Sequence, residues 1–207
     1  AKSMKHALIR NRRGFSTHYK IEEIDYWDKW ERFSQRPLKD IASTLHQDFA
    51  SRLKGKGAAD KSPDIVIMGR APTQRHPNEG SLGPSGTLKR DIPNLGQVRD
   101  ILGEGFATEI VNPASLHPDE TFRLCHQAKL IIGQHGAGLT NVFFCTNRTA
   151  MLEIVWPELQ TNSHINNYRP LCDALWLNWA RRPLQTHPFL AVDPKRILAE
   201  AQQLLME

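Results

Sequence analysis

The stretch Lys129-Leu-Ile-Ile-Gly-Gln-His-Gly-Ala-Gly-Leu-Thr-Asn141 decides how this sequence of 207 residues is interpreted. It begins with a short apolar run, typical of a buried strand, that ends at Gly133. The chain then turns through two glycines, and Thr140 and Asn141 open or continue a helix. In an open α/β sheet, ligands collect at the carboxyl ends of the strands, where this turn would lie. The alternative is a tight turn whose glycines only permit packing.

Apolar runs elsewhere in the chain predict further strands at residues 64–69, 106–111 and 151–156. Strands that are continuous apolar runs and alternate with helices of about ten residues indicate βαβ units and a parallel sheet covered on both faces. Hydrophobic residues at helical spacing predict those helices. They are expected at 21–30, at 38–53, from Asn94 to Gly103 or Gly105 with Asn94 as the cap, from Pro118 onward, and at 193–206.

The composition limits the class of protein. Hydrophobic residues make up 40% of the chain and charged residues 24%, which excludes disorder, collagen and coiled coil. The formal net charge is +5, which favours anionic partners in general. No run of about 18 apolar residues occurs, so no membrane span is predicted. The three cysteines form no Cys-x-x-Cys pair, and we interpret them as small buried hydrophobic residues: Cys125, Cys145 and Cys172.

The residues at the predicted sheet edge suit an anion. Arg70 follows the first strand, so it is expected at the same edge as His135 if the strands are parallel. His135 could donate to a phosphate or act as an acid or base. Gly136 and Gly138 would let the backbone approach a ligand closely, and the N–H groups of the helix start could bind a negative charge. A solvated basic loop is the alternative for the arginine.

Glu153 stands alone inside the apolar strand at 151–156. An ionised carboxylate buried there is costly without a partner. Two interpretations stay open: an ion pair with a nearby arginine, or a hydrogen bond to a ligand hydroxyl such as a ribose diol.

The sequence His135-Gly-Ala-Gly-Leu-Thr-Asn141, followed by Leu152-Glu153-Ile154, resembles the signature of glycosyltransferase family 61. That family includes plant xylan xylosyl- and arabinosyltransferases and animal enzymes that add N-acetylglucosamine to O-glycans or to Ser/Thr. Upstream, Arg70, the segment Arg90-Asp-Ile-Pro-Asn94 and the pair Gly105-Phe106 are similar to the family pattern. The resemblance covers about residues 64–156.

The resemblance implies the C-terminal half of a GT-B fold. We therefore expect an α/β, Rossmann-like parallel sheet flanked by helices, preceded by a helical N-terminal segment. Residues 1–57 would be the end of an N-terminal domain with a linker helix, 58–192 the nucleotide-sugar-binding domain, and 193–207 a C-terminal helix.

The resemblance also implies a function and a site. The expected reaction is inverting transfer of a sugar from a nucleotide-diphosphate donor, UDP-xylose or UDP-N-acetylglucosamine, to a hydroxyl of a glycan or glycoprotein. The chain holds no Asp-x-Asp, in keeping with a metal-independent family. Arg70 and Arg90 are expected on the diphosphate and Glu153 on the ribose, with His135 as the catalytic candidate unless a missing N-terminal half supplies the base. The implied donor site comprises Arg70, Arg90, Asn94, His135, Gly136, Gly138, Thr140, Asn141 and Glu153.

Other functions remain as alternatives. A non-catalytic or truncated nucleotide-binding module would share the same turn. A hydrolase would need a Gly-x-Ser-x-Gly elbow, which the sequence lacks. Nucleic-acid binding is weakly indicated, because the aromatic residues occupy core positions. The resemblance implies the Golgi or endoplasmic reticulum for a eukaryotic chain and the cytoplasm otherwise.

Overall fold

The computed structural model describes residues 5–11, 14–20, 35–53, 62–70, 91–157, 168–187 and 190–206. The chain divides into two compact units, residues 1–33 and 34–207. In the first unit, β1 (Lys5–Asn11) and β2 (Gly14–Lys20) form an antiparallel pair. The sequence pattern did not predict this hairpin, because its strands mix apolar with basic residues and contain no apolar run longer than three residues. The helix expected at 21–30 lies outside the described residues.

The second unit is built on a parallel sheet of five strands in the order β4-β3-β5-β6-β7. The α/β fold class predicted from the sequence is therefore confirmed. Three of the predicted strands lie at its centre and the fourth at one edge, while the other edge strand, β7, was not predicted because it is half-exposed and has no apolar run. The strands are β3 (Ile65–Met68), β4 (Thr108–Val111), β5 (Leu130–Gln134), β6 (Ala150–Ile154) and β7 (Asn178–Arg182).

Helices connect the strands, and most of them match the sequence pattern. Asn94 occupies the N-cap position of the helix that follows it, as predicted, although its side chain makes no capping hydrogen bond. The helix α5 was not predicted. The helices are α1 (Gln35–Leu53), α2 (Leu95–Gly103), α3 (Pro118–Gln127), the 3-10 helix η3 (Ala137–Phe144), α5 (Arg169–Leu175) and α6 (Pro194–Met206).

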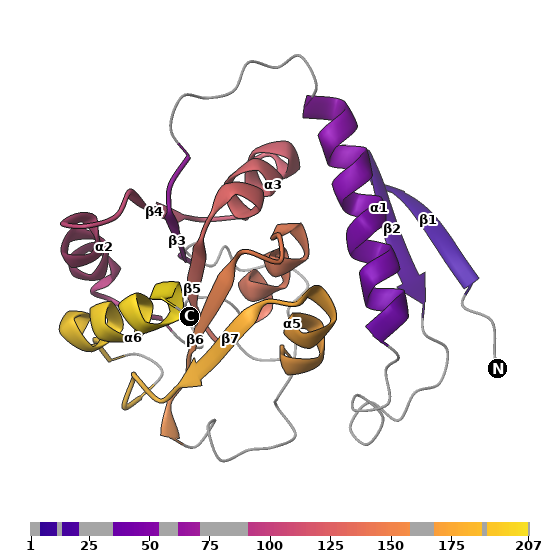
Figure 1. Ribbon diagram of the computed structural model, residues 1–207. Helices are drawn as coiled ribbons and strands as arrows, with labels where there is room; N and C mark the ends of the chain where they lie inside the picture. Colours follow the sequence, from indigo (N-terminus) through magenta and orange to yellow (C-terminus); the bar gives the residue numbers. More distant parts are fainter. Residues whose placement is uncertain are drawn as a thin grey trace, which may run out of the picture. The chain divides into compact units, whose positions relative to one another are not determined.

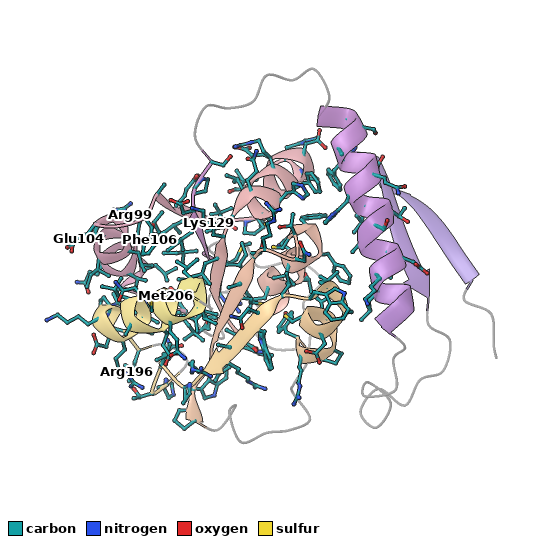
Figure 2. All side chains as sticks on the ribbon, in the orientation of Figure 1. Arg99, Glu104, Phe106, Lys129, Arg196 and Met206 are labelled. Atoms are coloured by element: carbon teal, nitrogen blue, oxygen red, sulfur yellow. The ribbon has the colours of Figure 1, made fainter. Side chains whose placement is uncertain are left out.

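The sheet is covered on both faces, as expected for a parallel sheet. Side chains such as Ile132 and Leu152 pack with α2 and α6, whereas Ile131 and Met151 pack with α3, η3 and α5. Figure 1 shows α2 and α6 on one side of the strands and α5 on the other. The polar faces of α2 and α6 point away from the sheet. Figure 2 shows Arg99 on α2 and Arg196 on α6 on that outer side.

The helix α1 belongs to the second unit and packs on α3, η3 and α5. Phe49 stacks on Phe122 with 4.8 Å between ring centroids, and Arg52 Nη1 lies 3.0 Å from Asp119 Oδ1. His46 Nε2 lies 3.0 Å from the carbonyl oxygen of Phe143, the penultimate residue of η3. The helical N-terminal segment that the sequence predicted is thus part of the packed structure.

Two further expectations concern the core and the membrane. All three cysteines are free and buried, and burial raises the pKa of the Cys145 thiol well above its ordinary value. They therefore act as small apolar residues, as predicted. Within the described helices, none combines the length and apolar character that a bilayer crossing requires.

Candidate functional site

The turn after β5 depends on two glycines. A Cβ atom on Gly133 would lie 2.7 Å from Leu139 Cδ2, so only glycine lets η3 pack directly against the end of the strand. Gly136 has φ 152° and ψ 175°, a conformation that is essentially restricted to glycine. Together they bring the chain from the strand into the 3-10 helix within two residues of His135.

His135 lies at the end of β5 and is 5% exposed. Its Nδ1 atom forms a short hydrogen bond with Glu153 Oε1 on the neighbouring strand β6. The backbone N–H of His135 donates to the carbonyl oxygen of Ile154 at 2.9 Å. Its ring meets the ring of Tyr168 edge-on, with centroids 5.8 Å apart. The imidazole is therefore held through its ring, its backbone and its neighbour.

Two more side chains hold the backbone of the turn. Arg70, which follows β3, donates from Nη2 to the carbonyl oxygen of His135 at 3.0 Å. The Tyr168 hydroxyl, 5% exposed, donates to the carbonyl oxygen of Gly136 at 2.5 Å. With both carbonyl groups engaged inside the protein, the peptide planes of this turn have a fixed orientation.

The start of η3 presents several backbone N–H groups. Within the described part of the chain, the N–H groups of Gly136, Ala137 and Gly138 donate no hydrogen bond. Successive N–H groups at a helix start attract an anion, and the Arg70 guanidinium lies at the same turn. The arrangement is chemically suited to a phosphate or diphosphate.

A family model described as Glycosyltransferase 61 matches residues 12–152, which is more than half of the chain. The chain belongs to the glycosyltransferase 61 family. No curated protein sequence matches it. Family membership supports glycosyltransferase activity, with a sugar donor and a glycan acceptor.

The structure brings some of the residues expected in the site together at the turn and places others apart from it. Arg70, His135, Gly136 and Glu153 form one contiguous group. Glu153 is 1% exposed and lies behind His135.

The next residues of the turn are more exposed. Asn141 donates from its side chain to the carbonyl oxygen of Gly138 at 2.8 Å and so stabilises η3. Thr140 is exposed on the same 3-10 helix.

Two further residues expected in the site, Arg90 and Asn94, come from the segment upstream of α2. Asn94 anchors Val192 through both ends of its amide: Nδ2 donates to the carbonyl oxygen at 2.8 Å, and Oδ1 accepts from the N–H at 3.0 Å. Nδ2 also donates to Gln97 Oε1 at 3.2 Å. Arg90 lies outside the described residues. The next residue, Asp91, is held at the carboxyl end of the sheet, because Gln185 Nε2 donates to its carbonyl oxygen at 2.7 Å.

Sequence reasoning missed four residues at or beside this turn: Arg181, Gln134, Gln185 and Tyr168. Arg181 on β7 lies with its Nε atom 3.9 Å from Glu153 Oε2. The sequence signal that pointed to such a residue was Glu153, a lone carboxylate in an apolar strand that required a cationic partner. Gln134 could have been noticed as a polar residue that ends a buried strand; it donates to Gln185 Oε1 at 2.5 Å. Tyr168 gave no local signal.

Among the side chains that the structure describes, no group of three His, Cys, Asp or Glu residues is placed to hold a metal ion.

Proposed function

We propose that this chain transfers a sugar, with inversion, from UDP-xylose or UDP-N-acetylglucosamine to a hydroxyl of a glycan or glycoprotein. The donor diphosphate would lie against the turn from His135 to Asn141. Family membership supports the reaction class, and the geometry of the turn supports the position of the diphosphate.

One observation carries the proposal: Arg70 comes from the end of one strand and donates to the carbonyl oxygen of His135 at the end of the next. This contact puts a permanent positive charge beside the N–H groups that begin η3. Negative charge accumulates on the leaving diphosphate in the transition state. Preorganised guanidinium and N–H groups stabilise it more than they stabilise the ground state.

The remaining donor-site residues follow from the family resemblance. Arg90 would bind the diphosphate with Arg70, and Gly136 and Gly138 would provide backbone contacts. Asn94, Thr140 and Asn141 complete the proposed set. These arginine and backbone groups make the proposed reaction independent of a metal ion. His135 is the catalytic candidate, through its Nε2 atom, unless a residue of an N-terminal half provides the base.

The test compares purified protein with an Arg70→Ala variant. Calorimetric titration with UDP, with both UDP-sugars and with pyrophosphate measures binding, and release of UDP in the absence of an acceptor measures donor hydrolysis. We expect wild-type binding and slow hydrolysis, both unaffected by EDTA. Arg70→Ala removes a charge-assisted contact, so the affinity for UDP and pyrophosphate should fall about 10- to 100-fold.

The matched control is Arg99→Ala. Arg99 is an exposed arginine on α2, where it pairs with its neighbour Asp100 at 2.6 Å. Its removal should leave binding and hydrolysis unchanged. Wild-type protein that binds neither UDP nor pyrophosphate would refute the donor site. Binding without hydrolysis by the wild type would instead support the non-catalytic nucleotide-binding module.

The proposed compartment is the lumen of the Golgi or endoplasmic reticulum in a eukaryotic source, which the family resemblance supports. In that compartment, the exposed Asn147 of the sequon Asn147-Arg148-Thr149 would be open to glycosylation. A mass decrease after enzymatic removal of N-glycans from the native protein would support the location, and an unchanged mass would count against it.

A further inference from the structure

Glu153 is the most buried charged side chain of the proposed site, at 1% exposure. Its two oxygen atoms face two different partners. Oε1 bonds to His135 Nδ1, and Oε2 lies 3.9 Å from Arg181 Nε. A buried carboxylate is tolerated only when hydrogen bonds and opposite charge replace the lost water. These contacts account for the burial of Glu153 without any ligand.

The sheet register explains how Glu153 reaches the imidazole. Glu153 is paired with Gly133 on β5 and with Arg181 on β7. Because Gly133 has no side chain, the space beside the Glu153 carboxylate is open to the ring of His135, which follows β5. The side chains of Met151 and Glu153 lie on the sheet face that α5 and η3 cover. A ribose diol would have to displace packed protein to reach the carboxylate.

We propose that Glu153 is a positioning residue that acts through His135 and does not bind the ribose. This inference rests on the donor site proposed above. The carboxylate accepts a hydrogen bond from Nδ1–H, which fixes the tautomer and the orientation of the ring. Nε2 is then the nitrogen that faces the ligand, and within the described residues it has no hydrogen-bond partner.

Other contacts of His135 agree with this role. The backbone N–H of His135 is bound to Ile154, and its carbonyl oxygen accepts from Arg70. With the backbone fixed on both sides, the ring has one remaining freedom, which is rotation about its side-chain bonds. The bond to Glu153 removes that freedom. A carboxylate behind an imidazole that faces a substrate also stabilises the ring whenever it carries a positive charge.

Two substrate probes separate the two roles of Glu153. Pyrophosphate lacks a ribose, whereas UDP has one. The test variant is Glu153→Gln, which keeps the side-chain size and removes the charge, so Arg181 is not left in an empty cavity. If Glu153 acts through His135, the affinities for UDP and for pyrophosphate should fall by the same factor, about 10-fold.

A double-mutant cycle with His135→Ala strengthens the separation. In the His135→Ala background, adding Glu153→Gln should change either affinity less than about 2-fold, because the positioned ring is already absent. A direct ribose contact predicts the opposite: UDP affinity falls, pyrophosphate affinity stays constant, and the loss persists without His135. That result would overturn the proposal.

The matched control is Glu200→Gln. Glu200 on α6 pairs with Arg182 at 2.7 Å, on the other face of the sheet. The variant removes one carboxylate from an ion pair with β7, and Glu200 does not contact His135. Neither affinity should therefore change. A loss equal to that of Glu153→Gln would show a general effect of charge removal and overturn the proposal.

A measurement without nucleotide tests the ring itself. The ¹⁵N chemical shifts of His135, assigned by comparison with His135→Ala, report which nitrogen carries the proton. We expect protonation at Nδ1 in the wild type and a larger Nε2-protonated fraction in Glu153→Gln. A wild-type ring protonated at Nε2 alone, or a tautomer unchanged in the variant, would overturn the positioning role. A wild type that binds no pyrophosphate but shows the expected shifts would refute only the donor site.

Discussion

The two faces of the central sheet differ in the polar groups that they bury. On the face covered by α2 and α6, the fully buried polar side chains are uncharged amides, and the Arg182–Glu200 ion pair lies nearer the solvent. Gln134 donates to Gln185, which donates in turn to the carbonyl oxygens of Asp91 and Leu190 at 2.7 and 2.6 Å. On the face covered by α3, η3 and α5, the carboxylate of Glu153 and the guanidinium of Arg181 lie among apolar side chains.

The neighbours Leu152 and Glu153 show this difference within one strand. Both are almost completely buried, and their side chains point to opposite faces of the sheet. A buried amide needs only hydrogen bonds, so amides can hold loops against the sheet at a moderate cost in desolvation free energy. An ionised pair needs partners of opposite charge as well. One face of the sheet therefore serves stability, while the other carries the charged groups on which the proposed chemistry depends.

The largest expected effect tests the face that serves stability. Leu152→Ala removes a fully buried side chain beside α6, so the free energy of unfolding should fall by about 2–5 kcal/mol. The affinity of the folded protein for pyrophosphate should stay within about 2-fold of the wild type. Urea denaturation and calorimetric titration measure the two quantities. An affinity loss as large as that of Arg70→Ala would abolish the distinction between the faces.

A smaller loss of stability is expected at the turn. Gly136→Ala places a Cβ atom on a backbone with φ 152°, which should cost about 1–3 kcal/mol of folding free energy. The turn would have to shift, so the affinity for pyrophosphate should fall at least about 10-fold.

The control for this variant lies on the other face. Gly96→Ala is in α2, where a Cβ atom meets nothing within 4 Å. It should raise the free energy of unfolding by up to about 1 kcal/mol and leave binding unchanged. A Gly136→Ala protein with normal affinity would remove the turn from the proposed site.

The smallest expected effect concerns pH. Burial lowers the pKa of His46 from its ordinary value of 6.5, and the neighbouring His126 lowers it further, although the hydrogen bond to Phe143 opposes both. The unfolded chain therefore takes up this proton more readily than the folded protein does. Stability should be unaffected above pH 6.5 and should fall as the pH drops below it.

His46→Phe should weaken this dependence, measured as the change in urea midpoint between pH 7.5 and pH 5.5. Because α1 packs on α3, η3 and α5, hydrogen exchange at acidic pH should rise on this side before it rises in α2 and α6. Equal exchange on both sides, or an unchanged pH dependence in the variant, would contradict the assignment to His46.

The sequence by itself determined the strands β3, β5 and β6 and the helices α1, α2, α3 and α6, because continuous apolar runs and helical periodicity are local properties. It also placed Arg70 and His135 at one edge, since parallel strands bring their carboxyl ends together. It showed that Glu153 needed a partner, because a buried charge is costly wherever it occurs.

Only the tertiary structure decided which partners those residues have. The Glu153 carboxylate could have met an arginine or a ligand, and the fold pairs it with His135, 18 residues away, and with Arg181. Tyr168 reaches Gly136 across 32 residues. The half-exposed strand β7 and the hairpin of β1 and β2 contain no apolar run longer than three residues, so local pattern could not reveal them. Such contacts depend on strand order and register, which long-range packing sets and no short stretch of sequence encodes.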